Sequence, residues 1–263
     1  MQFRASGILF AAVMIAMGII GIAKGGFAPI WAGVPQSLPD RQLLAYLCAF
    51  ASLAGGVALL IKRAAATAAA ILLLYLAAWT IAFKVPFIIR APLVEGGYQS
   101  TGENLVFVAA AWVLYAERGK RFLSGALGFR IAYFLYGLAL IAFGFSHFAY
   151  LELTAPLVPV WLGMPVFWAY LSGCIYLLAG VLLVLGIGTR FGAALSALEI
   201  TLITFLVWVP IVAAGNLSPM HWQETIMSLA LTASAWVIAA SLAGRSWFEL
   251  PWSGTWRNRA AAA

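Results

Sequence analysis

The chain contains an internal repeat that covers most of its length. Residues 45–116 align with residues 169–240 at a constant spacing of 124, without a gap. The matched segments include Ala45-Tyr46-Leu47 with Ala169-Tyr170-Leu171, Gly56-Val57 with Gly180-Val181, Val85-Pro86 with Val209-Pro210, and Ala111-Trp112-Val113 with Ala235-Trp236-Val237. A fixed internal period constrains architecture more strongly than any local pattern. We therefore expect two similar halves, residues 1–123 and 124–244, followed by a tail, residues 245–263.

The composition predicts that both halves lie in a membrane. Apolar residues make up 65% of the chain and charged residues only 9%, whereas charged residues are usually near 25% of a soluble domain. A membrane-spanning helix needs about 20 mostly apolar residues. Eight such stretches are expected, near residues 6–24, 43–61, 65–86, 103–116 (beginning near Ser100), 129–150, 167–187, 191–214 and 220–243. The predicted fold is all-α: an integral membrane protein with eight transmembrane helices arranged as two parallel four-helix bundles.

The distribution of basic residues predicts the orientation. Cytoplasmic loops carry the excess of Lys and Arg. With the N-terminus inside, eleven basic residues lie on the inner side and four, Lys24, Arg41, Lys84 and Arg90, on the outer side. Both termini are therefore expected to be cytoplasmic. The first segment has a counterpart at 129–150, so we interpret it as a retained helix rather than a signal peptide. The net charge of +7 fits this topology and anionic lipid, and no nucleic-acid partner is expected.

The tail and the outer loops carry most of the interfacial signals. Trp247, Trp252 and Trp256 occur together with arginines in the tail, a mixture typical of the cytoplasmic membrane interface. The outer segments 25–40 and 153–167 are rich in proline and each contains a tryptophan, Trp31 or Trp161. Each is expected to fold back over its half, either as a simple interfacial lid or as a lid over a lateral ligand pocket.

The second half resembles the DoxX-like membrane family, whose members are built from four-helix units. The residues that carry the resemblance are His147-Phe148, Pro159-Val160-Trp161-Leu162, Pro165, Tyr170-Leu171-Ser172-Gly173, Ala179-Gly180, Thr189-Arg190, Ala193-Ala194, Pro210 and Asn216. The first half matches only in outline, since it has Lys24 and no histidine, and Pro92 where Asn216 stands. The family includes the small membrane subunit of thiosulfate:quinone oxidoreductase. The resemblance implies the bacterial inner (cytoplasmic) membrane and a quinone-linked redox role, although a shared fold does not fix a reaction.

Glu199 is the ionisable residue for which burial in the membrane is expected to cost the most free energy. It lies near the middle of the segment 191–214, and its repeat counterpart is Tyr75. An ionisable group at membrane depth costs several kcal/mol and is a functional candidate. Glu199 is expected either to accept protons or bind a ligand, or to tie its helix to a neighbouring hydroxyl.

His147 and His221 are expected on the outer side of the second half. They could hydrogen-bond a quinone or a headgroup, or be ordinary interfacial residues. Two histidines suffice in principle for haem, but no spacing motif supports haem ligation, and no metal site is predicted. We name Glu199 and His147 as catalytic candidates.

Further candidates for ligand binding lie at the outer ends of other segments. Glu224, like Glu103 in the first half, either contributes to a site or caps the start of its helix. Lys24, Lys84 and Arg90 either attract an anionic substrate or reach to the interface. Single cysteines, Cys48 and Cys174, are interpreted as packing residues because neither has a Cys-x-x-Cys partner. The ligand-binding candidates are His221, Glu224, Trp161, Trp31, Lys24 and Arg90.

Three functional hypotheses remain open, and the sequence does not decide whether the chain is itself catalytic. The preferred hypothesis is a membrane subunit of a quinone-linked redox system that binds quinone, or another hydrophobic ligand, near the outer face. The second is a non-catalytic anchor or assembly subunit of a larger membrane complex. The third is a small-solute transporter, which the scarcity of Gly/Pro interruptions at corresponding mid-membrane places disfavours.

Overall fold

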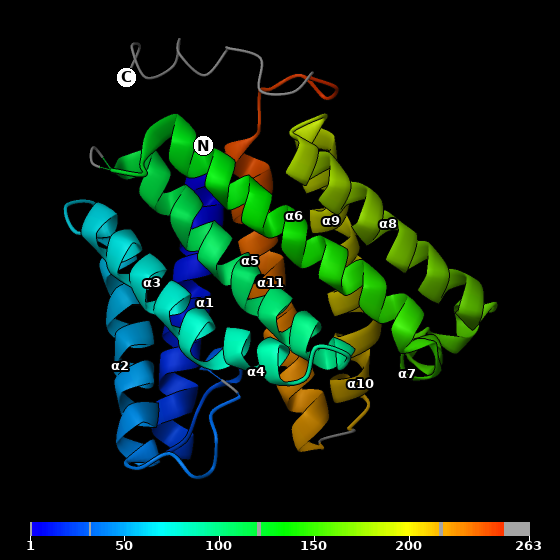
Figure 1. The fold of residues 1–263 in the computed structure, drawn as a ribbon, viewed down its shortest axis with the longest axis horizontal. Coiled ribbons are helices and arrows are strands. Elements are labelled where there is room, and N and C mark those ends of the chain that lie inside the picture. Colours follow the sequence, from blue (N-terminus) through cyan, green and yellow to red (C-terminus); the bar gives the residue numbers. More distant parts are fainter. Residues whose placement is uncertain (1, 32, 120–121, 216–217, 250–263) are drawn as a thin grey trace.

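The computed structural model describes residues 2–31, 33–119, 122–215 and 218–249, and within them the chain is helical (Figure 1). The α-helices are α1 (Gln2–Lys24), α2 (Arg41–Leu60), α3 (Ala65–Trp79), α4 (Val85–Arg90), α5 (Glu95–Arg118), α6 (Gly125–Ala149), α7 (Leu151–Thr154), α8 (Pro165–Leu185), α9 (Thr189–Ile203), α10 (Val209–Ala213) and α11 (Pro219–Ser241). Short 3₁₀ turns are η1 (Pro29–Trp31), η3 (Ala155–Leu157) and η4 (Val160–Leu162). Two π-helical turns, η2 (Thr80–Lys84) and η5 (Thr204–Trp208), join α3 to α4 and α9 to α10.

The helices form a multi-pass membrane protein. In the described residues, 7 helical spans are long and apolar enough to cross a membrane, and between 28% and 50% of each is buried inside the protein. Large apolar side chains such as Leu74, Ile81 and Ile89 point outward, as expected where the surrounding solvent is lipid. The all-α membrane fold is therefore confirmed, with one span fewer by these criteria than the eight expected.

The exception is α5, which is long enough at 24 residues but is not among these spans. The prediction placed its start near Ser100, whereas the helix begins at Glu95. Its first nine residues, 95–103, contain two glutamates and four glycine or serine residues, which lower the mean hydropathy of this part of the helix. The helix is central all the same, because most of its second half is buried.

Both π-helical turns occur just before a proline. Pro86 and Pro210 lack an amide N–H and crowd the carbonyl four residues earlier, which favours a locally wider helix. Thr80 and Thr204, which open the two turns, donate a hydrogen bond to the carbonyl of Leu76 and Ile200 respectively, each at 2.8 Å. The bounds of α3, η2, α9 and η5 repeat at the spacing of 124 seen in the sequence.

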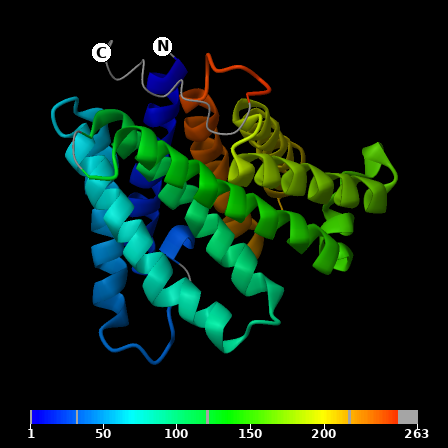
Figure 2. The ribbon, with the colours of Figure 1, turned by 45° about the horizontal axis from the view of Figure 1, so that its top comes forward.

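The two halves share a broad boundary (Figures 1 and 2). Helix α5 packs on α3, α6 and α11, and α1 packs on α2 and α11. One continuous core runs through this boundary, and its fully buried large side chains include Trp31, Tyr133, Tyr136 and Phe10. The division into two repeat domains stays a prediction; what the contacts describe is α5 and α11 lying side by side at the centre.

Helices α6 and α8 approach each other closely at Gly137 and Gly180. A Cβ added to Gly180 would lie 2.7 Å from the carbonyl oxygen of Gly137, and one added to Gly137 would lie 2.8 Å from the carbonyl oxygen of Gly180. Neither backbone can yield, so the absence of a side chain at position 180 serves helix packing.

We therefore expect Gly180→Leu to lower the free energy of unfolding by about 1–3 kcal/mol or more through overpacking. Thermal unfolding in mild detergent measures this, with Val181→Leu as the control because Val181 faces outward. Equal melting temperatures for the two variants would contradict the close crossing.

The described ends of the chain lie on the same side of the molecule, at the top of Figure 1. There, the tail folds back on α9: the Arg190 guanidinium lies 4.0 Å from the centre of the Trp247 ring, and the amide of Gly188 donates to the carbonyl of Glu249. The predicted interfacial residues Trp252 and Trp256, and the motif residue Asn216, lie outside the described residues.

Candidate ligand-binding pocket

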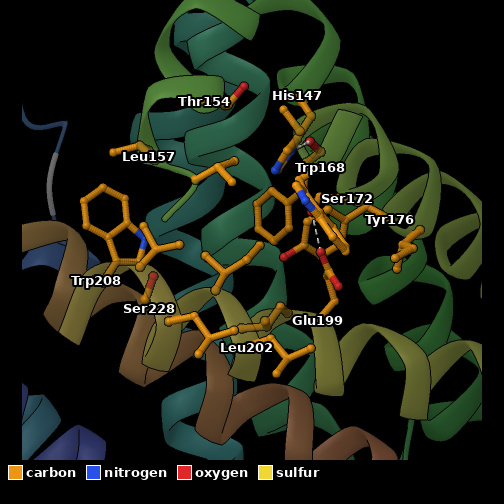
Figure 3. Close-up of a pocket in the computed structure, with 18 of the residues that line it drawn as sticks. His147, Thr154, Leu157, Trp168, Ser172, Tyr176, Glu199, Leu202, Trp208 and Ser228 are labelled. Carbon is orange, nitrogen blue, oxygen red and sulfur yellow. Dashed lines mark hydrogen bonds between the residues drawn. The ribbon is translucent and has the colours of Figure 1, made fainter. Parts of the chain in front are cut away.

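A cavity of about 590 Å³ lies in the second half of the chain. Its walls come from α6, α8, α9, η5 and α11, and its cover comes from the segment η3–η4. Figure 3 shows Ser172 between His147 and Glu199 on one wall and Trp208 on the other. Cavities of 300–1,000 Å³ with apolar walls and a few polar groups are typical of small-molecule sites, so this cavity is the candidate site.

The cavity opens sideways, toward the lipid-facing surface. Leu198 and Leu202 line the cavity and are also 52% and 42% exposed on the outside of the protein. Leu171 and Ile175 of α8 line the same region. An apolar chain attached to a bound molecule could therefore leave between α8 and α9 into the hydrocarbon of the bilayer.

Glu199 lies on α9 with its carboxyl group at the cavity wall. Ser172 Oγ donates a hydrogen bond of 2.5 Å to Glu199 Oε1, and both residues line the cavity. Among the described residues, no hydrogen-bond partner is recorded for Oε2. The carboxyl group is thus held by one oxygen and has the other available to a ligand. Both expectations for Glu199 are compatible with this geometry, since the hydroxyl contact and the cavity position coexist.

His147 lies on α6 and lines the same cavity. Its Nδ1 is 2.9 Å from the carbonyl oxygen of Phe143, and a carbonyl only accepts, so Nδ1 carries the proton. Whenever the ring is neutral, Nε2 is an acceptor. The ring centre is 5.4 Å from that of Tyr176, and Glu199 is close enough to interact electrostatically with His147.

The first half also contributes to the cavity. Gln99 and Glu103 reach it from α5, and Glu224 reaches it from α11. Glu103 interacts electrostatically with both Glu224 and Lys84. Lys84 Nζ is buried and donates a hydrogen bond of 2.6 Å to Ser100 Oγ. Carboxyl groups from both halves therefore meet at one edge of the cavity, with an ammonium group nearby.

The expected capping roles of Glu103 and Glu224 are wrong. Helix α5 begins eight residues before Glu103, and α11 begins five residues before Glu224, so neither carboxyl group lies in a first helical turn. The cap of α11 is Ser218, which accepts a hydrogen bond from the amide of His221 at 3.2 Å.

The corresponding region of the first half is filled by Trp31. This side chain is 0% exposed, and its Nε1–H donates a hydrogen bond of 2.9 Å to Ser52 Oγ. Its ring centre lies 5.1 Å from those of both Tyr75 and Trp79, in edge-to-face arrangements. We expected Trp31 at the membrane interface or at a ligand; it is instead part of the core.

Trp161, the motif counterpart of Trp31, lies outside its cavity and is 73% exposed. The difference follows from where the spacer residues lie. In the first half, residues 36–40 separate the motif from α2, whereas Pro165 ends the motif and also begins α8. The second tryptophan is therefore held at the outer end of α8. Other lid residues, Leu157 and Leu162, line the cavity, so the lid covers a pocket.

Several predicted residues lie away from the cavity. Lys24 and Arg90 are exposed and do not line it, and His221 does not line it either. His221 Nδ1 is buried and without a hydrogen-bond partner among the described residues, and the cavity holds only His147 of the two histidines. No group of three or more His, Cys, Asp or Glu in the described residues could hold a metal. Cys48 is buried but Cys174 is exposed, so the packing interpretation is wrong for Cys174.

Sequence reasoning missed much of the cavity lining, notably Ser172, Tyr176, Trp168, Trp208 and Gln99. The repeat held a usable signal for Ser172. Cys48 and Tyr75 lie 3.4 Å apart, Sγ to Oη, and the same two positions in the second half are Ser172 and Glu199. Both positions differ between the halves, Cys48 against Ser172 and Tyr75 against Glu199. Considering the two differences together would have indicated that Ser172 contacts Glu199.

The fold and the cavity define an α-helical multi-pass membrane protein with a lateral pocket in its second half. Residues 125–209, from α6 to the start of α10, match the family model DoxX. This part of the chain is similar to the DoxX domain, and the resemblance inferred from the sequence is confirmed there. Comparison with curated proteins and with solved structures gave no match.

Proposed function

We propose that the protein is a membrane subunit of a quinone-linked redox system and binds quinone in the pocket of its second half. The observation that supports this most is a laterally open apolar cavity with a carboxyl group and an imidazole on one wall. The excess of Lys and Arg in the loops on one side favours cytoplasmic termini and a pocket toward the outer face, in the bacterial inner membrane that the family resemblance implies.

The residues of the pocket fit a quinone. Trp168, Tyr176 and Trp208 offer aromatic surfaces, and the opening near Leu198 and Leu202 suits an isoprenoid tail. A quinone, when bound, supplies reversible two-electron, two-proton redox chemistry. His147 Nε2 accepts a hydrogen bond or a proton, while Glu199, held by Ser172, exchanges a proton through its free oxygen.

The carboxyl groups at the boundary of the two halves extend this chemistry. Glu103 and Glu224 line the pocket away from Glu199, and Gln99 lies on the same face of α5. They provide proton-holding groups between the pocket and the outer surface. Haem is not part of the proposal, since His147 and His221 do not share the cavity.

The transporter hypothesis gains one observation. We expected few interruptions at corresponding places in the two halves. However, η2 interrupts the span Ala65–Arg90 and η5 interrupts the span Thr189–Ala213, at positions 124 residues apart. Transporters often use such paired interruptions at their sites. Here only one of the paired sites is open, because Trp31 fills the other, and this asymmetry favours a single bound ligand.

Purification from native membranes in mild detergent tests the proposal. Mass spectrometry of co-purified lipids and proteins is expected to find about one quinone per chain together with an electron-transfer partner. Glu199→Gln, in the pocket lining, and Tyr136→Phe, outside the lining, serve as matched variants. A large assembly with redox-inactive partners and no enriched quinone would instead make the chain an anchor or assembly subunit.

A further inference from the structure

The filled half of the molecule offers a template for the open half. The helix bounds that surround Trp31 and those that surround the cavity repeat at a spacing of 124. The three residues that contact the Trp31 indole are Ser52, Tyr75 and Trp79. Their counterparts at this spacing are Tyr176, Glu199 and Ile203, and all three line the cavity.

The polar contacts on these walls also correspond. In the first half, Cys48 and Tyr75 contact each other beneath the indole. In the second half, Ser172 and Glu199 take these two positions with a hydrogen bond of 2.5 Å. In the first half, these positions surround the Trp31 indole, a planar bicyclic ring with one hydrogen-bonding edge. In the second half, the matching positions line the open cavity.

We infer that the pocket holds the ring of its ligand where the first half holds the Trp31 indole. This inference rests on the proposed function and narrows the ligand to a planar aromatic or quinoid ring of about bicyclic size. The ring packs beside Ile203 with its polar edge toward Tyr176 and Glu199. The attached apolar tail leaves past Leu198 and Leu202.

A second consequence concerns stoichiometry. Trp31 closes the first half with the chain's own side chain, so each chain binds one ligand. The Trp31 indole is completely enclosed. Removing this side chain leaves a cavity lined by the aromatic rings of Tyr75 and Trp79. The first half is therefore a latent second site for a small planar ring.

The experiment counts bound 2-methyl-1,4-naphthoquinone by equilibrium dialysis against the full chain in detergent. The wild type is expected to bind one molecule and Trp31→Gly two, while a Trp31→Gly chain that also carries Ile203→Trp returns to one. One molecule bound by both wild type and Trp31→Gly would overturn the inference but leave the proposed pocket intact. No binding to the wild type would overturn the proposed function and, with it, the assignment of the ring.

A pair of tyrosine variants tests the orientation without enlarging the core. Tyr176 lines the cavity, while Tyr136 on α6 is also buried, bonds Ser196 at 3.0 Å and does not line the cavity. Tyr176→Phe is expected to weaken naphthoquinone binding about fivefold to tenfold, the usual effect of one lost hydrogen bond. Tyr136→Phe is expected to leave the affinity unchanged. Equal affinities for the two variants would overturn the placement of the polar edge, even if Trp31→Gly does not fold.

Discussion

Glu199→Gln is expected to lower quinone-linked turnover about 100-fold or more while changing quinone affinity less than about 10-fold. The amide keeps the shape of the carboxyl group and can still bond Ser172 Oγ. It cannot exchange a proton, and a positioned acid or base contributes about 10²–10⁴-fold to such reactions. Turnover is measured as quinone reduction by the complex isolated from native membranes, and affinity is measured by quenching of tryptophan fluorescence.

Two controls separate chemistry from packing. Ser172→Ala removes the bond that orients Glu199 and is expected to cost a smaller fraction of turnover. Tyr75→Phe changes the repeat counterpart of Glu199, which lies in the filled half against Trp31, and is expected to have no effect on turnover. Full activity of Glu199→Gln would exclude a proton-transfer role for this residue.

Ile203→Trp is expected to abolish ligand binding without unfolding the protein. Ile203 lines the cavity and stands where the first half has Trp79, which packs beside Trp31 and Phe83. The first half demonstrates that a tryptophan fits beside the π-helical turn. The added ring occupies space that the ligand needs, so we expect at least about a 100-fold weaker Kd, equal to about 2.7 kcal/mol.

The melting temperature of Ile203→Trp supplies the internal check. Filling a cavity with an apolar ring is stabilising where the shape allows it, so this temperature is expected to stay the same or rise. Ile203→Leu keeps the volume and is expected to bind normally. Normal binding by Ile203→Trp would mean that the ligand lies elsewhere in the protein.

Much of the fold could be predicted because membrane helices follow from hydropathy and length alone. The starts of α2, α8, α9 and α11 lie within two residues of the expected starts. The fourth span was placed too late because Glu95, Gly96 and Gly97 carry little hydropathy. What buries α5 is contact with α3, α6 and α11, and a one-dimensional average does not contain such contacts.

The site was predicted only where a polar residue stood alone in an apolar segment. Glu199 and His147 satisfied that criterion, and both line the cavity. Glu224 lines the cavity too, although it does not cap the start of α11. Trp31 and Trp161 share one motif yet lie in opposite environments, because the position of the spacer relative to the next helix decides whether the indole turns inward. Spacer geometry is a property of the folded loops, and the motif alone does not express it.

The paired π-helical turns also bear on the history of the chain. A π-helical turn holds one residue more than the α-helical turn it replaces, so each turn is the trace of an insertion. Thr80–Lys84 and Thr204–Trp208 stand at identical places in the two halves. The matched turns agree with the internal repeat that the sequence predicts.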